Sequence, residues 1–302
     1  MNAVSKDLIV KIADINELEA MMAIEKAAMP SNQYLFQTKT EMFDPTQGAM
    51  LTAYIDGKPV GISHLAFLPD GSGWFEILRV LPEYQKCGAG TAMWDKALEI
   101  CEEKRLRSIG MFTGVEGHVS RKIAERKGLT LISTYDEYLI AREDIPECLK
   151  GDADKWNAIM PSENPEEEAC KATGFRSAEY SEIAAAVEAG KAGYDGLCDF
   201  NRTFYDYSEE NLKWMCENKM VHIKDDCIVF TGARFNKNAA LETAFISGDV
   251  NEALKFAAAR LKAGTQPKIH IAAPAHRTDL IEKFRELGFK FRASIIILKR
   301  EF

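Results

Sequence analysis

A loop that holds two glycines separates a run of strand-forming residues from a helical pattern. The run covers residues 75–80, the loop covers residues 85–90, and the helical pattern follows directly. A strand, a glycine loop and a helix in this order point several backbone N–H groups at one spot, where the positive end of the helix dipole adds to them. Gly88 and Gly90 carry no Cβ, so an anion can approach the backbone closely. The order and spacing therefore predict a phosphate-binding site.

The residues that flank the loop make this pattern more specific. The stretch L-x-V-x-P-E-Y-Q-x-x-G-x-G, from Leu78 to Gly90, resembles motif A of the GNAT superfamily, the acyl-CoA-dependent N-acetyltransferases. The patterns of Rossmann and Walker loops, G-x-G-x-x-G and G-K-[ST], are absent from it. The resemblance implies an α/β fold with a mixed, mostly antiparallel sheet flanked by helices. It also implies acetyl-CoA as the co-substrate.

The resemblance assigns the acetyl-CoA contacts to the end of the strand and to the loop. In the family, the strand backbone carries the pantetheine and acetyl groups, and the loop holds the pyrophosphate. The residues implied in cofactor binding are Leu78, Arg79, Val80, Gln85, Lys86, Cys87, Gly88, Ala89, Gly90 and Thr91.

Glu76 is the first candidate for the general base. It precedes Leu78 by two residues, so in a regular strand both side chains share one face. A partly buried carboxylate there could take the proton of an ammonium substrate, directly or through water. The alternative is a strand glutamate paired with a nearby Arg or Lys. By resemblance, the backbone N–H near Leu78 would hold the thioester oxygen.

The general acid is less clearly marked. In many relatives a Tyr on the helix after the fifth strand protonates the leaving thiolate, but Ala124 falls at that place here. The family's frequent Asn ahead of that helix falls on Gly117. Tyr135 is the candidate acid, with Tyr138 beside it, although both could be core residues. His118 could also reach the site or simply cap the helix, and a thiolate of low pKa could leave without an acid.

Length, charge and cysteine usage limit the class of protein. A chain of 302 residues can hold two domains, and its net charge of −8 argues against nucleic acid as a partner while suiting a cationic amine. We expect no membrane span and no signal peptide. Seven cysteines without C-x-x-C spacing predict reduced thiols in the cytoplasm. Neither His270 nor His276 has a carboxylate or cysteine partner at metal spacing, so the sequence predicts no metal.

The chain around the loop reads as alternating strands and helices. A strand at residues 8–11 is followed by a helix that Asp14 could cap, and Asp56-Gly57 predicts a hairpin turn. Residues 109–113 predict a strand, residues 119–127 a helix ended by Gly128, and residues 129–133 and 138–141 the last two strands of a first domain, 1–142. Later predictions are helices at 181–191 and 209–216 and a hairpin at 221–233.

The end of the chain repeats the end of this first domain. Gly288 follows Gly128 by 160 residues (288 − 128), and the flanking strand and helix patterns match without a gap. The second copy, 143–302, lacks a Gln-x-x-Gly-x-Gly loop: Ser247-Gly248 leads directly to Asp249, which could cap the next helix. The chain thus resembles a tandem GNAT protein with a degenerate C-terminal copy. We expect one acyl-CoA per chain, with the second copy serving packing and the acceptor side.

These observations favour an N-acetyltransferase that moves an acetyl group from acetyl-CoA to a primary amine of a small molecule or peptide. The intact loop and Glu76 support turnover. Ala124 favours the alternative, a CoA-binding regulatory or scaffold module without turnover. The sequence leaves self-association open.

Overall fold

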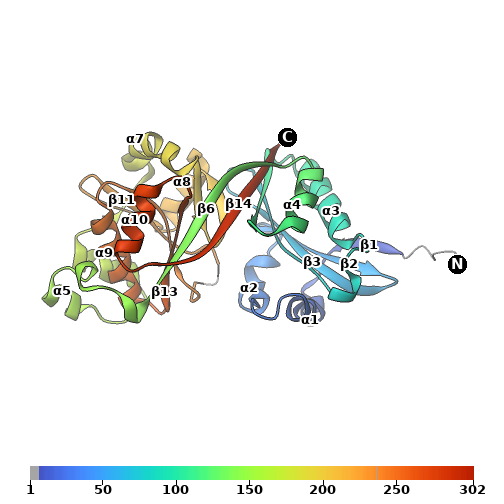
Figure 1. The fold of residues 1–302 in the computed structure, drawn as a ribbon, viewed down its shortest axis with the longest axis horizontal. Helices are drawn as coiled ribbons and strands as arrows, with labels where there is room; N and C mark the ends of the chain where they lie inside the picture. Colours follow the sequence, from blue (N-terminus) through green and yellow to red (C-terminus); the bar gives the residue numbers. More distant parts are fainter. Residues whose placement is uncertain (1–6, 236) are drawn as a thin grey trace. The chain divides into compact units, whose positions relative to one another are not determined.

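The computed structural model describes residues 7–235 and 237–302, which form two compact units (Figure 1). Unit 1 takes the described residues up to Met111, together with Gly117–Leu131 and Leu298–Phe302. Unit 2 takes Phe112–Glu116 and Ile132–Ile297. Each unit contains both parallel and antiparallel strand pairs with helices beside them, and the fold is of the mixed α/β class that the sequence predicts.

Unit 1 is built on strands β1 to β5 in that order. The pairs β1–β2, β2–β3 and β3–β4 are antiparallel, whereas β4–β5 is parallel. Figure 1 shows α1 and α2 on one side of these strands and α3 and α4 on the other. The elements are β1 (Leu8–Ile12), α1 (Leu18–Ala28), α2 (Leu35–Met42), β2 (Gly48–Ile55), β3 (Lys58–Phe67), β4 (Gly73–Val80), α3 (Ala89–Lys104), β5 (Ser108–Gly114) and α4 (His118–Arg126).

Local sequence signals in unit 1 are confirmed. Asp14 and Glu17 form a capping box at the 3-10 turn (Ile15–Glu17) that leads into α1. Asp56 and Gly57 both take positive φ, 52° and 78°, in the turn between β2 and β3. A two-residue turn with both residues at positive φ matches the right-handed twist of the strands that it joins.

Strand β4 leaves β5 soon after it begins. The two strands pair only at Gly73↔Ile109 and Trp74↔Gly110. Against β3 the register shifts between Ile62 and His64, and Ile77 takes a φ of 60°, a rare conformation for a β-branched residue. One strand therefore carries a bulge at Ile77, which bends β4 where it separates from β5.

The strands of unit 2 lie in the order β14-β6-β13-β12-β11-β10-β7, and β8 and β9 form a separate two-stranded hairpin. The pair β12–β13 is parallel, and β13–β6, β11–β12 and β10–β11 are antiparallel. The hairpin and helices predicted at 221–233, 181–191 and 209–216 are confirmed. The elements are β6 (Thr130–Ala141), α5 (Ala153–Ala158), α6 (Pro165–Thr173), β7 (Arg176–Ser177), α7 (Tyr180–Gly190), β8 (Leu197–Phe200), β9 (Thr203–Asp206), α8 (Glu209–Glu217), β10 (Val221–Lys224), β11 (Cys227–Gly232), β12 (Leu241–Ser247), α9 (Val250–Ala263), β13 (Lys268–Pro274), α10 (Thr278–Glu286) and β14 (Lys290–Glu301).

The prediction of two short strands at 129–133 and 138–141 is wrong. They are one strand, β6, whose residues 135–141 pair with β13 in unit 2. The polar residues in the middle of the strand have partners on distant elements, since Ser294 Oγ donates to Asp136 at 2.5 Å and Arg202 binds Glu137. Conversely, the end of β14 belongs to unit 1, where the N–H of Phe302 donates to Arg107 O at 2.9 Å. The sequence-based division into domains 1–142 and 143–302 rests on the two copies of the repeat, and it stays a prediction.

The repeat is visible as a constant offset between elements. Strands β5 and β13, helices α4 and α10, and strands β6 and β14 each begin and end 160 residues apart. Gly128 and Gly288 end the two helices with φ of 84° and 86°. The same strand–helix–strand unit therefore occurs twice.

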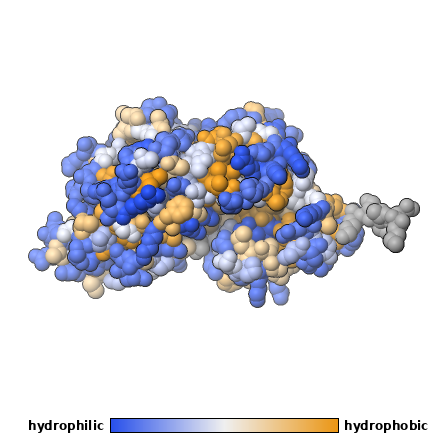
Figure 2. Space-filling view, viewed as in Figure 1, coloured by the Kyte–Doolittle hydropathy of each residue, from blue (hydrophilic) through white to orange (hydrophobic). Residues whose placement is uncertain are grey.

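The face drawn in Figure 2 is mostly hydrophilic, with smaller groups of apolar side chains between the charged ones. In the described part of the chain, no helix is both long enough and apolar enough to cross a lipid bilayer.

The last contact between β4 and β5 gives a stability prediction. A Cβ on Gly110 would lie 2.5 Å from Cζ3 of the buried Trp74. Gly110→Ala should therefore lower the free energy of unfolding by about 1–3 kcal/mol, measured by urea denaturation. Gly114→Ala is the control because its Cβ would meet nothing within 4 Å in the same strand. Equal stability of the two variants would contradict this packing.

Candidate active site

The two-glycine loop connects β4 to α3 on the surface of unit 1. After a 3-10 turn (Pro82–Tyr84), Lys86 takes a φ of 63° and Gly88 a φ of 90°. Gly88 is the N-cap of α3, and it has no side chain to cap the helix. The first N–H groups of a helix have no partner within the helix. Gln85, Lys86, Cys87 and Gly88 are exposed, so an anion can reach these donors from solvent.

The two glycines of the loop differ in why glycine is needed. At Gly88 the backbone conformation itself requires glycine, because L side chains rarely adopt a φ of 90°. Gly90 has no such strain, and a Cβ there would only touch Ile123 and Leu78 at 3.8 and 3.9 Å. Ala89 anchors the loop below, packed with Met93 in the hydrophobic core of unit 1.

The part of β4 that follows Trp74 has a backbone edge that does not pair with β5. Leu78, Arg79 and Val80 are half-buried along it. Arg79 Nη1 donates to the carbonyl of Leu78 at 3.1 Å. Because strand ladders normally use alternate N–H groups on each edge, this stretch can offer backbone donors to a bound molecule.

Glu76 lies at the bend of β4 and is buried, with 8% of its surface exposed. Its Oε1 contacts Nδ1 of His64 at 2.8 Å, and His64 is 1% exposed. A Cβ on Gly48 would lie 2.3 Å from His64 Nε2, so a glycine at this place leaves room for the imidazole. Sequence reasoning missed His64 because its pairing with Glu76 depends on the register of β3 and β4.

The candidate acids Tyr135 and Tyr138 belong to unit 2, and both hydroxyl groups are hydrogen-bonded. Tyr135, on β6 in unit 2, donates its hydroxyl to Tyr194 O at 2.5 Å and also contacts Leu197 O at 3.2 Å. Burial raises the pKa of Tyr135 well above its ordinary value. Tyr138 is buried and accepts from Arg285 Nη2 at 3.1 Å.

On α4, the place of the family tyrosine is filled by a small buried residue, Ala124. Gly117 is the N-cap of this helix, and His118 is exposed at its first position. The structure therefore brings Glu76 and the loop into one unit, whereas Tyr135 belongs to the other.

In unit 2 the matching helix start is already occupied. Asp249 caps α9, and its side chain accepts from the N–H groups of Asn251 and Glu252 at 2.7 and 3.2 Å. The predicted cap is confirmed. A Cβ on Gly248 would lie 2.9 Å from Cys227 Cα, so the short connection from β12 to α9 is tightly packed. The donors that an anion needs are used internally here.

All seven cysteines are free thiols, and Cys87 in the loop is exposed. Both histidines, His270 and His276, lie close to carboxylates, although none of these stands at metal-ligand spacing along the chain. His270 contacts Glu242 and Glu137, and His276 lies 3.8 Å from Asp195. These partners are far apart in sequence, so spacing along the chain could not reveal them.

Comparisons with known proteins agree with this geometry. Residues 14–129 match the model of the acetyltransferase (GNAT) family. No curated protein matches the chain significantly. Among solved structures, a GCN5-related N-acetyltransferase from Sphaerobacter thermophilus is similar, with a TM-score of 0.62 at 11% identity, over 97% of this chain and 95% of that one.

A tandem GNAT protein from the clavulanic acid biosynthesis pathway, solved without acetyl-CoA, is also similar. Its TM-score is 0.57 at 12% identity, and 98% of each chain is covered. At such low identity these likenesses concern the fold, and they extend over both units. The loop, the bent β4 and the family match lead to one conclusion: over residues 14–129 this chain carries an acyltransferase domain of the GNAT family.

Proposed function

We propose that the chain is an N-acetyltransferase that moves the acetyl group of acetyl-CoA to a primary amine of a small molecule or peptide. The observation that carries the proposal is the uncapped start of α3 behind an exposed glycine loop. The same place in the second copy is capped by Asp249. An open helix start favours a phosphate, and a capped one does not.

The residues of unit 1 suit acetyl-CoA. The pyrophosphate would rest on the backbone from Lys86 to Gly90, where Gly88 supplies the left-handed conformation. The pantetheine and acetyl groups would follow the free edge of β4 from Val80 back toward Leu78. Acetyl-CoA supplies an activated thioester there. Gln85, Arg79, Cys87, Ala89 and Thr91 complete the proposed contacts.

Glu76 is the proposed base. Its carboxylate would accept the proton of the ammonium group, directly or through water, so that the amine can attack the thioester carbonyl. His64 Nδ1 contacts the carboxylate at 2.8 Å and would hold it in place as a positioning residue. A backbone N–H near Leu78 would stabilise the negative charge on the carbonyl oxygen.

Tyr135 as the acid stays a prediction of the sequence. Its hydroxyl proton is already donated to a carbonyl of unit 2, which weighs against that role. Departure of the CoA thiolate without a protein acid fits the replacement of the family tyrosine by Ala124. A cytoplasmic location and the absence of nucleic-acid and membrane partners also stay predictions.

The second candidate function is a CoA-binding module without turnover, and Ala124 is the observation that favours it. Release of free thiol from acetyl-CoA in the presence of amines, polyamines, amino acids and peptides separates the two. Thiol release that depends on an added amine supports the enzyme. Tight CoA binding with no amine-dependent release supports the module.

The loop assignment predicts a loss of affinity in Gly88→Glu. The variant places a side chain and a like charge where the pyrophosphate would rest. Acetyl-CoA affinity should fall by about tenfold or more in calorimetry. Gly57→Glu is the matched control, since Gly57 has a similar φ of 78° and open space around it. Unchanged affinity in Gly88→Glu would remove the loop from the site.

The base assignment predicts a loss of turnover in Glu76→Gln. Turnover should fall by about 10²–10⁴-fold at neutral pH, while acetyl-CoA affinity stays close to that of the wild type. The activity profile should also lose its acidic limb, because the amide does not titrate. Glu83→Gln, at an exposed carboxylate of the turn after β4, is the control. Full activity of Glu76→Gln across the pH range would place the base elsewhere.

A further inference from the structure

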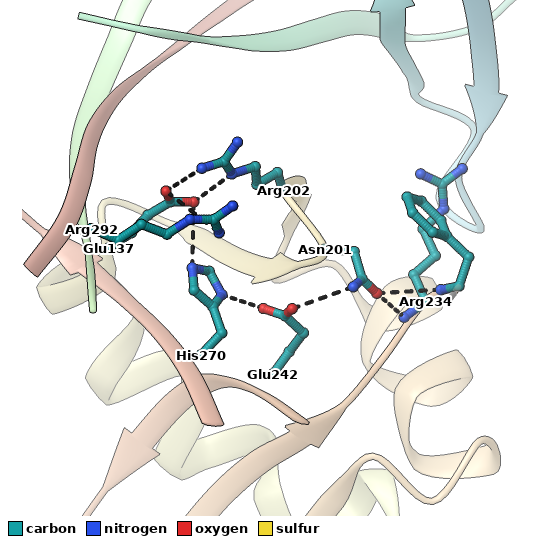
Figure 3. A network of polar contacts seen from close by, with 8 residues as sticks. Glu137, Asn201, Arg202, Arg234, Glu242, His270 and Arg292 are labelled. Carbon is teal, nitrogen blue, oxygen red and sulfur yellow. Dashed lines mark hydrogen bonds and ion pairs between the residues drawn. The ribbon is translucent and has the colours of Figure 1, made fainter. Parts of the chain in front are cut away.

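Unit 2 contains a buried cluster of charged side chains that the proposed acetyl transfer does not use (Figure 3). Asp199, Glu242 and His270 come from β8, β12 and β13 and are all buried. One ligand atom from each lies within 4.8 Å of the other two. The three side chains thus converge from three strands on one small volume.

The cluster holds an oxygen that lacks a protein partner. Asp199 is 3% exposed, and among the described residues its Oδ1 has no hydrogen-bond partner. A buried carboxylate oxygen without a donor is costly, so a group absent from the protein chain would be expected to satisfy it. His270 Nδ1 and Glu242 Oε2 contact each other beside it.

Residues around the cluster make contacts that orient the side chains of His270 and Glu242. Glu137 Oε1 lies 3.4 Å from His270 Nε2, and Arg202 Nε donates to the same carboxylate at 2.6 Å. Asn201 Nδ2 donates to Glu242 Oε1 at 3.3 Å. The Asn201 amide oxygen is itself fixed by the N–H of Arg234 at 2.7 Å. Outer carboxylates and amides of this kind orient the ligands of metal ions in proteins.

The two-residue turn that presents two of these outer residues places an arginine in a conformation that is rare for it. Asn201 and Arg202 both have positive φ, 56° and 60°, between β8 and β9. Asn tolerates this conformation, but Arg rarely adopts it. Strain of this kind persists where the surrounding structure holds it, and it collects at functional sites.

The fold does not require the cluster, because the first copy lacks it. Glu242 pairs with His270 across β12 and β13, and the corresponding pair across β4 and β5 is Trp74 with Gly110. There the indole packs against the glycine. Buried charges are seldom more stabilising than apolar packing of the same volume, so the charged version calls for another reason.

Charge counting leaves two ways to balance the cluster. With a neutral imidazole, the carboxylates of Glu137, Asp199 and Glu242 outweigh the guanidinium of Arg202 by two negative charges. Arg292 lies 3.9 Å from Glu137, but its side chain is 41% exposed to solvent. A divalent cation would balance the charge, and so would two protons.

The raised pKa values of Asp199 and His270 favour the alternative in which two protons balance the charge. Burial, with Glu242 beside it, raises the pKa of Asp199 to about 8. Burial alone would lower the pKa of His270, but Glu242 and Glu137 outweigh it and raise the pKa to about 10. The same negative field that retains these protons attracts a cation.

We propose that Asp199, Glu242 and His270 bind a divalent first-row transition-metal cation, such as zinc or manganese. One imidazole and two carboxylates suit these ions, and solvent would complete the coordination. The cation would satisfy Asp199 Oδ1 and replace the direct contact of His270 with Glu242. It would tie the β8–β9 hairpin to β12 and β13, which gives unit 2 a structural role in the protein.

The test is the metal content of the full-length chain, produced with zinc and manganese in the medium and passed through gel filtration. We expect about one equivalent of metal per chain by mass spectrometry. Asp199→Asn, Glu242→Gln and His270→Gln should each lose it. His222→Gln, at another buried histidine of unit 2 outside the cluster, should retain it.

X-ray absorption on the wild type provides a measurement that needs no variant. The proposed site gives only nitrogen and oxygen ligands, whereas stray binding to the free cysteines would give sulfur. Sulfur ligands, a metal-free wild type, or metal retained by all three cluster variants would overturn the proposal. If the wild type contains no metal and Asp199→Asn is as stable as the wild type, protons rather than a cation balance the charge of the cluster.

Discussion

The proposed function of unit 1 depends on the N–H groups at the start of α3, which no side chain caps. They are available because Gly88 caps the helix with backbone alone and with a φ of 90°. The bend of β4 at Ile77 then turns the strand away from β5, so its free edge leads toward the same loop. Glu76 comes just before that bend in β4, and His64 is its partner on the neighbouring strand β3. The buried carboxylate, the free strand edge and the proposed anion site thus follow one another along the chain.

The second copy keeps the backbone and changes the chemistry. Its elements β13, α10 and β14 follow β5, α4 and β6 of the first copy at a constant offset of 160 residues. The helix start is closed by Asp249, and the apolar contact of Trp74 with Gly110 is replaced by the ion pair of Glu242 with His270. The two units also differ from a simple tandem division, since β6 pairs with β13 in unit 2 and the end of β14 belongs to unit 1.

Features encoded by neighbouring residues could be predicted from the sequence. The Asp56-Gly57 turn, the Asp14 and Asp249 caps and the loop before α3 all depend on short-range patterns, and the repeat shows as similarity between two segments of the chain. Features that are set by the pairing of strands could not be predicted from the sequence. Thr134–Glu137 reads as a break, yet contacts from distant elements keep β6 continuous. The partners of Glu76 and His270 likewise depend on register between strands, which no local pattern in the sequence reports.

We propose that the first copy binds acetyl-CoA and the second does not, because only the first has an open helix start. Calorimetric titration of the full-length chain with acetyl-CoA tests it most directly. The account predicts saturation at about one acetyl-CoA per chain, since Asp249 uses the donors and repels the phosphate in the second copy. Two equivalents of comparable affinity would contradict it.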